Sequence, residues 1–131
     1  MPRTTLAVET VAEAILEILR VRGIDYVFGN SSTSVIDAFA KSSASQVMTA
    51  PEPVLTPHEQ VAVAMAHGAY IASRRVQAVF VYSTAGTANA LNAIINASRA
   101  RVPILVFSTR TAVSDNCAVR GARDTHVHWS Q

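Results

Sequence analysis

The chain has 131 residues, half of them hydrophobic and 15% charged, which is enough for one domain with a real core. Its formal charge of +2 comes from scattered arginines, and its apolar runs of about 5–7 residues are far shorter than the roughly 20 that a membrane helix requires. These totals argue against a nucleic-acid partner and a membrane protein, and the single cysteine, Cys117, excludes an internal disulfide framework. No signal-peptide pattern opens the chain, so we expect a cytoplasmic protein.

The first half of the chain is predicted to alternate between helices and short strands. A first helix, capped by Thr4 or Thr5 and stopped by Gly23, aligns apolar side chains on one face: Val8, Val11, Ile15, Ile18 and Leu19. The elements expected after it are, in order, a strand at 24–28, a polar loop at 29–34, a helix at 35–40, a surface loop at 41–46 and short strands at 47–48 and 54–55.

The second half continues the alternation. Pro57 is expected in the first turn of a helix that runs to about residue 75, a favoured place for proline. The later elements are a strand at 76–83, a turn at 84–89, a helix at about 87–99 and a strand at 103–108. Helices that alternate with nearly continuous apolar strands indicate an α/β fold, a parallel sheet with helices on both faces. We find no linker, so we expect residues 1–131 to be a single domain; the abrupt apolar–aromatic end predicts a fragment of a longer polypeptide.

Glu59 is the only acidic residue between Pro53 and Ser114, and it directly follows the predicted strand at 54–55. Ligands of open parallel sheets bind outside the carboxyl ends of the strands, so Glu59 is expected in that crevice. Its position is also compatible with a plain helix-end role, because a carboxylate complements the helix dipole and Thr56-x-x-Glu59 matches a capping box. The functional interpretation is a partly buried acid that holds or shares a proton with a ligand.

Two further stretches follow predicted strands. "STAGTAN", from Ser83 to Asn89, leads into a helix, and its small residues allow a backbone or ligand to approach closely. It is also compatible with a tight turn in which Gly86 serves only the geometry. "YVFGNSS", residues 26–32, likewise ends in small polar residues. Neither stretch has the spacing of a phosphate-binding glycine motif.

No metal site is predicted. His58–Glu59 is not a zinc-protease motif, because Ala62 stands where the second histidine would be needed. Cys117, His126 and His128 are metal-binding residue types, but their spacing fits no familiar pattern.

Taken together and in this order, these stretches resemble the N-terminal, pyrimidine-binding domain of thiamine-diphosphate-dependent enzymes, with acetolactate synthase and benzoylformate decarboxylase as the nearest members. The family's glutamate box, His-Glu-Gln-x-Ala-x-x-Met-Ala-x-Gly, is matched from His58 to Gly68, with Ala69 and Tyr70 transposed after it. The glycine turn with Asn89, and the proline before the last strand, also follow the family pattern over about residues 8–110. The resemblance implies a flavodoxin-like three-layer sandwich.

The resemblance also implies thiamine diphosphate as cofactor and a role for each matching residue. Glu59 would be catalytic: it would hydrogen-bond N1′ of the aminopyrimidine and promote the tautomer that takes the thiazolium proton, before attack on a 2-keto acid and decarboxylation. A partly desolvated carboxyl is expected to have the raised proton affinity that this needs. The positions implied to bind the cofactor are Asn30, Ser31, Glu59, Ser83, Gly86 and Asn89, and those implied to line the substrate pocket are Tyr82 and Thr33.

The chain departs from the family pattern at several positions. Asn30-Ser31-Ser32 replaces the usual Pro-Gly loop, and Tyr82 stands where benzoylformate decarboxylase has a catalytic histidine. Thr109-Arg110 replaces the Gly-Gln that usually follows the last strand, which puts the synthase substrate pocket in doubt.

The family's Gly-Asp-Gly…Asn motif, which holds Mg²⁺ and the diphosphate, does not occur in this sequence. The resemblance therefore implies a diphosphate-binding domain on the same or a partner chain, a homo-oligomer (dimer or tetramer), and no catalysis by this chain alone. Two alternatives are a degenerate module that only oligomerises and a pyrimidine-domain subunit of a split enzyme. A flavodoxin-like binder of another ligand is a third.

Overall fold

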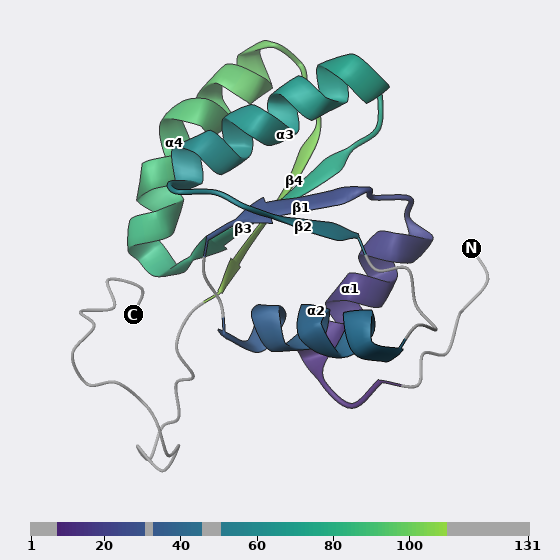
Figure 1. Cartoon of the computed structure of the whole chain (residues 1–131). Coiled ribbons are helices and arrows are strands. Elements are labelled where there is room, and N and C mark those ends of the chain that lie inside the picture. The colour runs from purple at the N-terminus through teal and green to yellow at the C-terminus, as the bar shows by residue number, and fades with distance from the viewer. Residues whose placement is uncertain (1–7, 31–32, 46–50, 110–131) are drawn as a thin grey trace.

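Residues 8–30, 33–45 and 51–109 are described by the computed structural model, and they form one sheet between two pairs of helices (Figure 1). The elements follow in the order α1 (Val11–Val21), β1 (Tyr26–Gly29), α2 (Thr33–Ser45), β2 (Glu52–Leu55), α3 (Glu59–Ser73), β3 (Gln77–Tyr82), α4 (Ser83–Arg99) and β4 (Ile104–Thr109). Helices α1 and α2 lie on one side of the sheet, and α3 and α4 lie side by side on the other. The predicted fold class is confirmed.

The sheet has the strand order β2-β1-β3-β4, and every pairing in it is parallel. The chain moves from β1 outward to β2 and then returns past β1 to β3. The order therefore reverses between β1 and β3, and a crevice opens at the carboxyl ends of strands at such a point. Three connections start from this edge of the sheet, those that lead into α2, α3 and α4.

Alternation along the central strands builds two separate cores. Val27, Ala78 and Phe80 face α1 and α2, where they join Leu16 and Leu19. The intervening strand residues Phe28, Val79 and Val81 face α3 and α4 and join a core of mostly small side chains: Ala62, Val63, Ala66, Ala90 and Ala93. Because side chains on a strand alternate between faces, a strand buried on both sides has to be apolar throughout.

The first helix begins later than predicted. Thr10 is its N-cap, and its hydroxyl accepts the backbone N–H of Glu13 at 3.2 Å; the predicted caps Thr4 and Thr5 lie outside the described residues. The predicted apolar face is also wrong in part. Of the predicted residues Leu19 is buried, whereas Val11 and Ile18 are 78% and 50% exposed; Leu16 and Ala12, which the prediction left out, complete the buried face.

Helix α2 is longer than predicted and includes residues 41–45, which were expected to be a surface loop. Lys41 lies in this added part, and its ammonium contacts the Glu13 carboxylate at 3.3 Å. The helix packs on α1, and such a tertiary contact overrides the weak local preference of a serine-rich stretch. The predicted strand at 47–48 lies outside the described residues.

The start of α3 corrects two predictions. His58 is its N-cap, and Nδ1 of His58 accepts the backbone N–H of Gln60 at 3.2 Å, so Pro57 precedes the helix instead of lying in its first turn. Thr56 does not cap the helix, because its hydroxyl has no hydrogen-bond partner among the described residues. Its backbone N–H is bonded to the carbonyl oxygen of Gly29 at 2.9 Å and so is not available to the Glu59 side chain. The capping box is therefore absent.

Helix α4 starts directly after β3, without the predicted turn at 84–89. Ser83 makes the reversal alone with a φ of 56°, in the left-handed region that few residues other than glycine adopt. Gly86 lies inside the first turns of the helix. The chain therefore does not need a glycine at position 86 in order to turn.

Candidate functional site

Glu59 is the first residue of α3 and lies at the edge of the sheet where β1, β2 and β3 end. It is only 9% exposed, and among the described residues it is the one buried carboxylate. A charge that is removed from water must be compensated by hydrogen bonds or counter-charges. The residues around Glu59 supply that compensation through hydrogen bonds.

Two asparagine amides from different elements bind the two oxygens of the Glu59 carboxylate. Nδ2 of Asn89, on α4, donates to Oε2 at 3.0 Å, and Nδ2 of Asn30, directly after β1, donates to Oε1 at 3.3 Å. The fold brings these three residues together over sequence separations of 29 and 30 positions. The predicted grouping of Asn30, Glu59 and Asn89 is therefore present in the structure.

Gly86 lies one helical turn before Asn89, and its Cα faces the same carboxylate. A Cβ built on Gly86 would lie 3.1 Å from Oε1, 3.4 Å from Cγ and 3.5 Å from Cδ of Glu59. Any side chain at position 86 would thus crowd the acid. Gly86 is present because α4 passes close to Glu59, which corrects the interpretation of this glycine as a turn residue.

The hydrogen bonds also decide the charge of Glu59. Burial, the largest single influence, raises the pKa of Glu59, but the Asn89 amide, the backbone N–H of Glu59, the Asn30 amide and the nearby His58 lower it. Together these groups outweigh burial, so the pKa lies below its ordinary value and the carboxylate is anionic at neutral pH. In this state of the chain the expected raised proton affinity is wrong, because amide donors stabilise the charged form.

Three of the remaining predicted site residues, Ser83, Tyr82 and Thr33, lie where strands end or helices begin. Ser83 lines a separate cavity of about 450 Å³ beside Thr84, Thr87 and Ser108, on the side of α4 that faces β4. Tyr82 is the last residue of β3 and is partly buried. Thr33 is the first residue of α2, and Ser31 lies outside the described residues.

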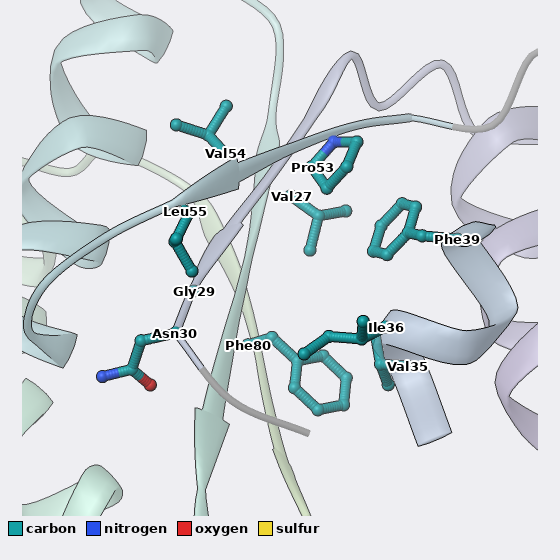
Figure 2. A pocket seen from close by; sticks show the side chains of 10 residues that line it. All are labelled: Val27, Gly29, Asn30, Val35, Ile36, Phe39, Pro53, Val54, Leu55 and Phe80. Carbon is teal, nitrogen blue, oxygen red and sulfur yellow. The ribbon is translucent and has the colours of Figure 1, made fainter. Parts of the chain in front are cut away.

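An apolar cavity of about 210 Å³ lies between α2 and the strands β1 and β2, and it reaches the carboxyl ends of these two strands (Figure 2). Figure 2 shows Phe39, Ile36 and Leu55 around it and Asn30 at its border, with the Asn30 amide turned away from Ile36 and Phe39. Asn30 therefore separates an apolar space on the α2 side from the polar surroundings of Glu59.

Two buried polar residues were not predicted from the sequence, Thr56 beside the site and Gln77 at the opposite end of the strands. The Thr56 hydroxyl is buried, the residue being 1% exposed, and it has no hydrogen-bond partner within the described part of the chain. Gln77, also 1% exposed, joins β3 to β1, because its Oε1 accepts the backbone N–H of Tyr26 at 2.9 Å. A polar residue at the start of an apolar strand was the available signal for Gln77.

Within residues 8–30, 33–45 and 51–109, no group of three or more histidine, cysteine, aspartate or glutamate side chains is arranged to hold a metal ion. Cys117, His126 and His128 lie outside these ranges. The described helices are all too short or too polar to cross a membrane.

Comparison with known proteins gives consistent matches. Residues 9–128 match the family of the thiamine pyrophosphate enzyme N-terminal TPP binding domain. The acetolactate synthase large subunit of Haemophilus influenzae is 35% identical over 97 residues, which are 74% of this chain and 16% of that protein. The benzoylformate decarboxylase of Pseudomonas aeruginosa is 34% identical over 98 residues, which are 75% of this chain and 18% of that protein.

A solved structure agrees with these sequences. The thiamine diphosphate-dependent 4-hydroxybenzoylformate decarboxylase of Rhodococcus jostii RHA1 superposes with a TM-score of 0.65 at 27% identity, over 79% of this chain and 19% of that chain. The present chain thus spans less than a fifth of the length of each of these three relatives. With its parallel sheet and its match over residues 9–128, the chain belongs to the N-terminal TPP-binding domain family of thiamine pyrophosphate enzymes, close to acetolactate synthases and benzoylformate decarboxylases.

Proposed function

We propose that residues 1–131 form a single domain that supplies the pyrimidine-binding half of a thiamine-diphosphate site. The whole protein would be an acetolactate-synthase-like enzyme that carboligates or decarboxylates 2-keto acids. The observation that carries this proposal is Glu59, a buried carboxylate at the carboxyl ends of parallel strands in a chain of this family. The glutamate is the residue to which the family resemblance assigns the activation of the cofactor.

The surroundings of Glu59 suit an aminopyrimidine ring. Glycine at position 86 lets α4 pass close to Glu59, since an added Cβ would be only 3.1 Å from Oε1. A side chain at position 86 would push the carboxylate aside, whereas glycine leaves it in place to meet a ring nitrogen. Mg²⁺ and the diphosphate have no matching acidic cluster among the described residues, so a second domain, on this or a partner chain, would hold them.

Thiamine diphosphate, when bound, supplies the electron sink for cleavage of the bond beside a keto group. The chain's own contribution is a carboxylate that accepts a hydrogen bond from a ring nitrogen. A ring over Glu59 would exclude water and compete with the Asn30 donor for Oε1, and both changes raise the pKa of the acid. Glu59 could then share a proton with the ring nitrogen, even though the uncovered carboxyl is fully ionised at neutral pH.

The other residues would have supporting roles. Asn30, Gly86 and Asn89 shape the surroundings of Glu59, and Ser31 and Ser83 stay proposed cofactor contacts. Tyr82 and Thr33 are the proposed substrate contacts, because they end β3 and begin α2 at the carboxyl ends of the strands. We further propose a homo-oligomer, a dimer or a tetramer, located in the cytoplasm.

The test is an activity assay of the natively purified protein with thiamine diphosphate, Mg²⁺ and pyruvate. The measured quantities are CO₂ release and acetolactate formation. Glu59→Gln should lower kcat by about 10²-fold or more, because an amide cannot take up the shared proton. Glu52→Gln, an exposed carboxylate in β2, is the matched control and should keep full activity. Equal turnover of Glu59→Gln and the parent would show that the assignment of Glu59 is wrong.

One observation supports the alternative of a non-catalytic association module. Helix α3 exposes Val61 and Met65, and helix α4 exposes Leu91 and Ile95, each pair four residues apart on its helix. Such exposed apolar side chains are typical of helices that dock against another surface. If the protein associated through these helices but showed no cofactor-dependent turnover with any 2-keto acid, the association module or a subunit of a split enzyme would be the better description.

A further inference from the structure

The carboxylate of Glu59 is held unequally at its two oxygens. The bond from Asn89 to Oε2 is 3.0 Å long, within the usual range for N–H···O bonds, whereas the bond from Asn30 to Oε1 is 3.3 Å and exceeds it. Oε1 is also the oxygen closest to Gly86, at 3.1 Å from the position of an added Cβ. Oε1 is thus the less firmly hydrogen-bonded oxygen, and it lies beside a helix position that only glycine can occupy without crowding it.

Asn89 has no evident structural reason to be an asparagine. It lies inside the 17-residue helix α4, where asparagine is a poorer helix former than alanine, and it is exposed, so its burial does not stabilise the core. The described contact of its side chain is the hydrogen bond to Glu59. Because the buried residues Gly86 and Ala90 fix this face of α4 against the protein, the donor is held on a rigid element.

We infer that Asn89 is a positioning residue that anchors Oε2 of Glu59, and that Oε1, beside Gly86, is the oxygen that engages the bound ligand. This inference rests on the proposed function and divides the work of the two carboxylate oxygens. Asn30 is then an exchangeable partner: it satisfies Oε1 while no ligand is present and gives way when a ring nitrogen arrives. Oε1 then has a hydrogen-bond partner both with and without the ligand, so the buried carboxylate keeps its position between turnovers.

The anchor is tested first on the 131-residue chain, without cofactor, by following the ¹³C carboxyl signal of Glu59 through a pH titration. Asn89→Ala removes a donor to the charged form, so the pKa of Glu59 should rise, and Asn89→Asp should raise it further by adding a like charge. Asn92→Asp is the matched control, because it places the same charge at an exposed position of the same helix, three residues later. It should leave the pKa of Glu59 nearly unchanged. His58 also lowers the pKa of Glu59 and is kept constant in all variants.

The division of roles is tested in the complete holoenzyme. Asn89→Ala should lower kcat on the order of 10–100-fold and move the acidic limb of the pH–rate profile upward, because the acid loses its orientation. Asn89→Gln, which keeps an amide donor, should restore part of both. Asn30→Ala should lower kcat less than tenfold, since its bond is the one that the ligand replaces, while Gly86→Ala should weaken thiamine-diphosphate binding on the order of tenfold by crowding Oε1.

These outcomes separate the inference from the function on which it rests. If Glu59→Gln abolished turnover but Asn89→Ala changed neither the Glu59 pKa nor kcat, the anchor would be refuted and the proposed function would stand. If Asn89→Ala raised the Glu59 pKa but no 2-keto acid were turned over, the anchor would stand and the proposed function would fail. A larger loss from Asn30→Ala than from Asn89→Ala would overturn the assignment of the two oxygens.

Discussion

Gly29 is the position where the structure makes its sharpest prediction about stability. It is the last residue of β1, pairs with Phe80 of β3, and passes so close to it that an added Cβ would lie 2.6 Å from the Phe80 carbonyl oxygen and 3.2 Å from its Cβ. Comfortable carbon–oxygen contacts between strands are about 3.3–3.6 Å, so the overlap is roughly 0.7 Å. The obstacle is backbone of a central strand, which cannot rotate away as a side chain could.

The expected effect of Gly29→Ala follows from these distances. Overpacking of this kind costs about 1–3 kcal/mol, and the smaller entropy of the unfolded alanine chain returns about 0.4–1 kcal/mol. Because the added Cβ meets backbone, we take the cost at the upper end of its range and expect Gly29→Ala to lower the free energy of unfolding by about 2–2.6 kcal/mol, measured by urea denaturation of the 131-residue chain. Because Asn30 follows directly, the variant should also weaken its bond to Glu59.

Gly68 provides the matched control for Gly29. It lies within α3, and a Cβ built there would meet no heavy atom within 4 Å. Gly68→Ala should therefore stabilise the chain by about 0.5–1 kcal/mol, because alanine is the better helix former. The two glycines thus predict opposite signs for the same substitution. Gly29→Ala with unchanged or increased stability would refute the close approach of β1 to β3 on which the site geometry depends.

Three further predictions concern buried polar side chains. Because the pKa of Glu59 in the folded chain is lowered from its ordinary value of 4.5, its contribution to stability is present above that value and is lost as the pH falls through the folded pKa. Glu59→Gln should therefore lower the urea midpoint more at pH 7 than at pH 3, and an equal effect at both values would contradict the ionised state. Gln77→Leu should lower the free energy of unfolding by about 1–3 kcal/mol, because the backbone N–H of Tyr26 loses its acceptor. The control Gln60→Leu, at an exposed position, should change it by less than about 0.5 kcal/mol in the same urea titration. Thr56→Val should raise the melting temperature, because it replaces an unpartnered buried hydroxyl with a methyl group of the same size, and a clear decrease would reveal a partner for Oγ1.

Short stretches of sequence were sufficient to predict the order of the elements. Apolar residues at 78–81 and 104–107 have the composition of strands that are buried on both faces, and a parallel sheet follows once helices separate them. Element boundaries were less predictable. The start of α3 depends on a bond from Thr56 to Gly29, and the start of α4 depends on Ser83 taking a positive φ. Neither the hydrogen bond of Thr56 nor the backbone conformation of Ser83 leaves a local signal in the sequence.

The sequence alone determined that one carboxylate follows a strand, because Glu59 stands without acidic neighbours at the head of an apolar helix. It also determined the fold class, since the period of the apolar residues depends only on neighbours in the chain. The tertiary structure decided the state of that carboxylate. Amide donors from positions 29 and 30 residues away fold onto Glu59 and hold it ionised despite its burial, and no local pattern encodes the distance between β1 and α4.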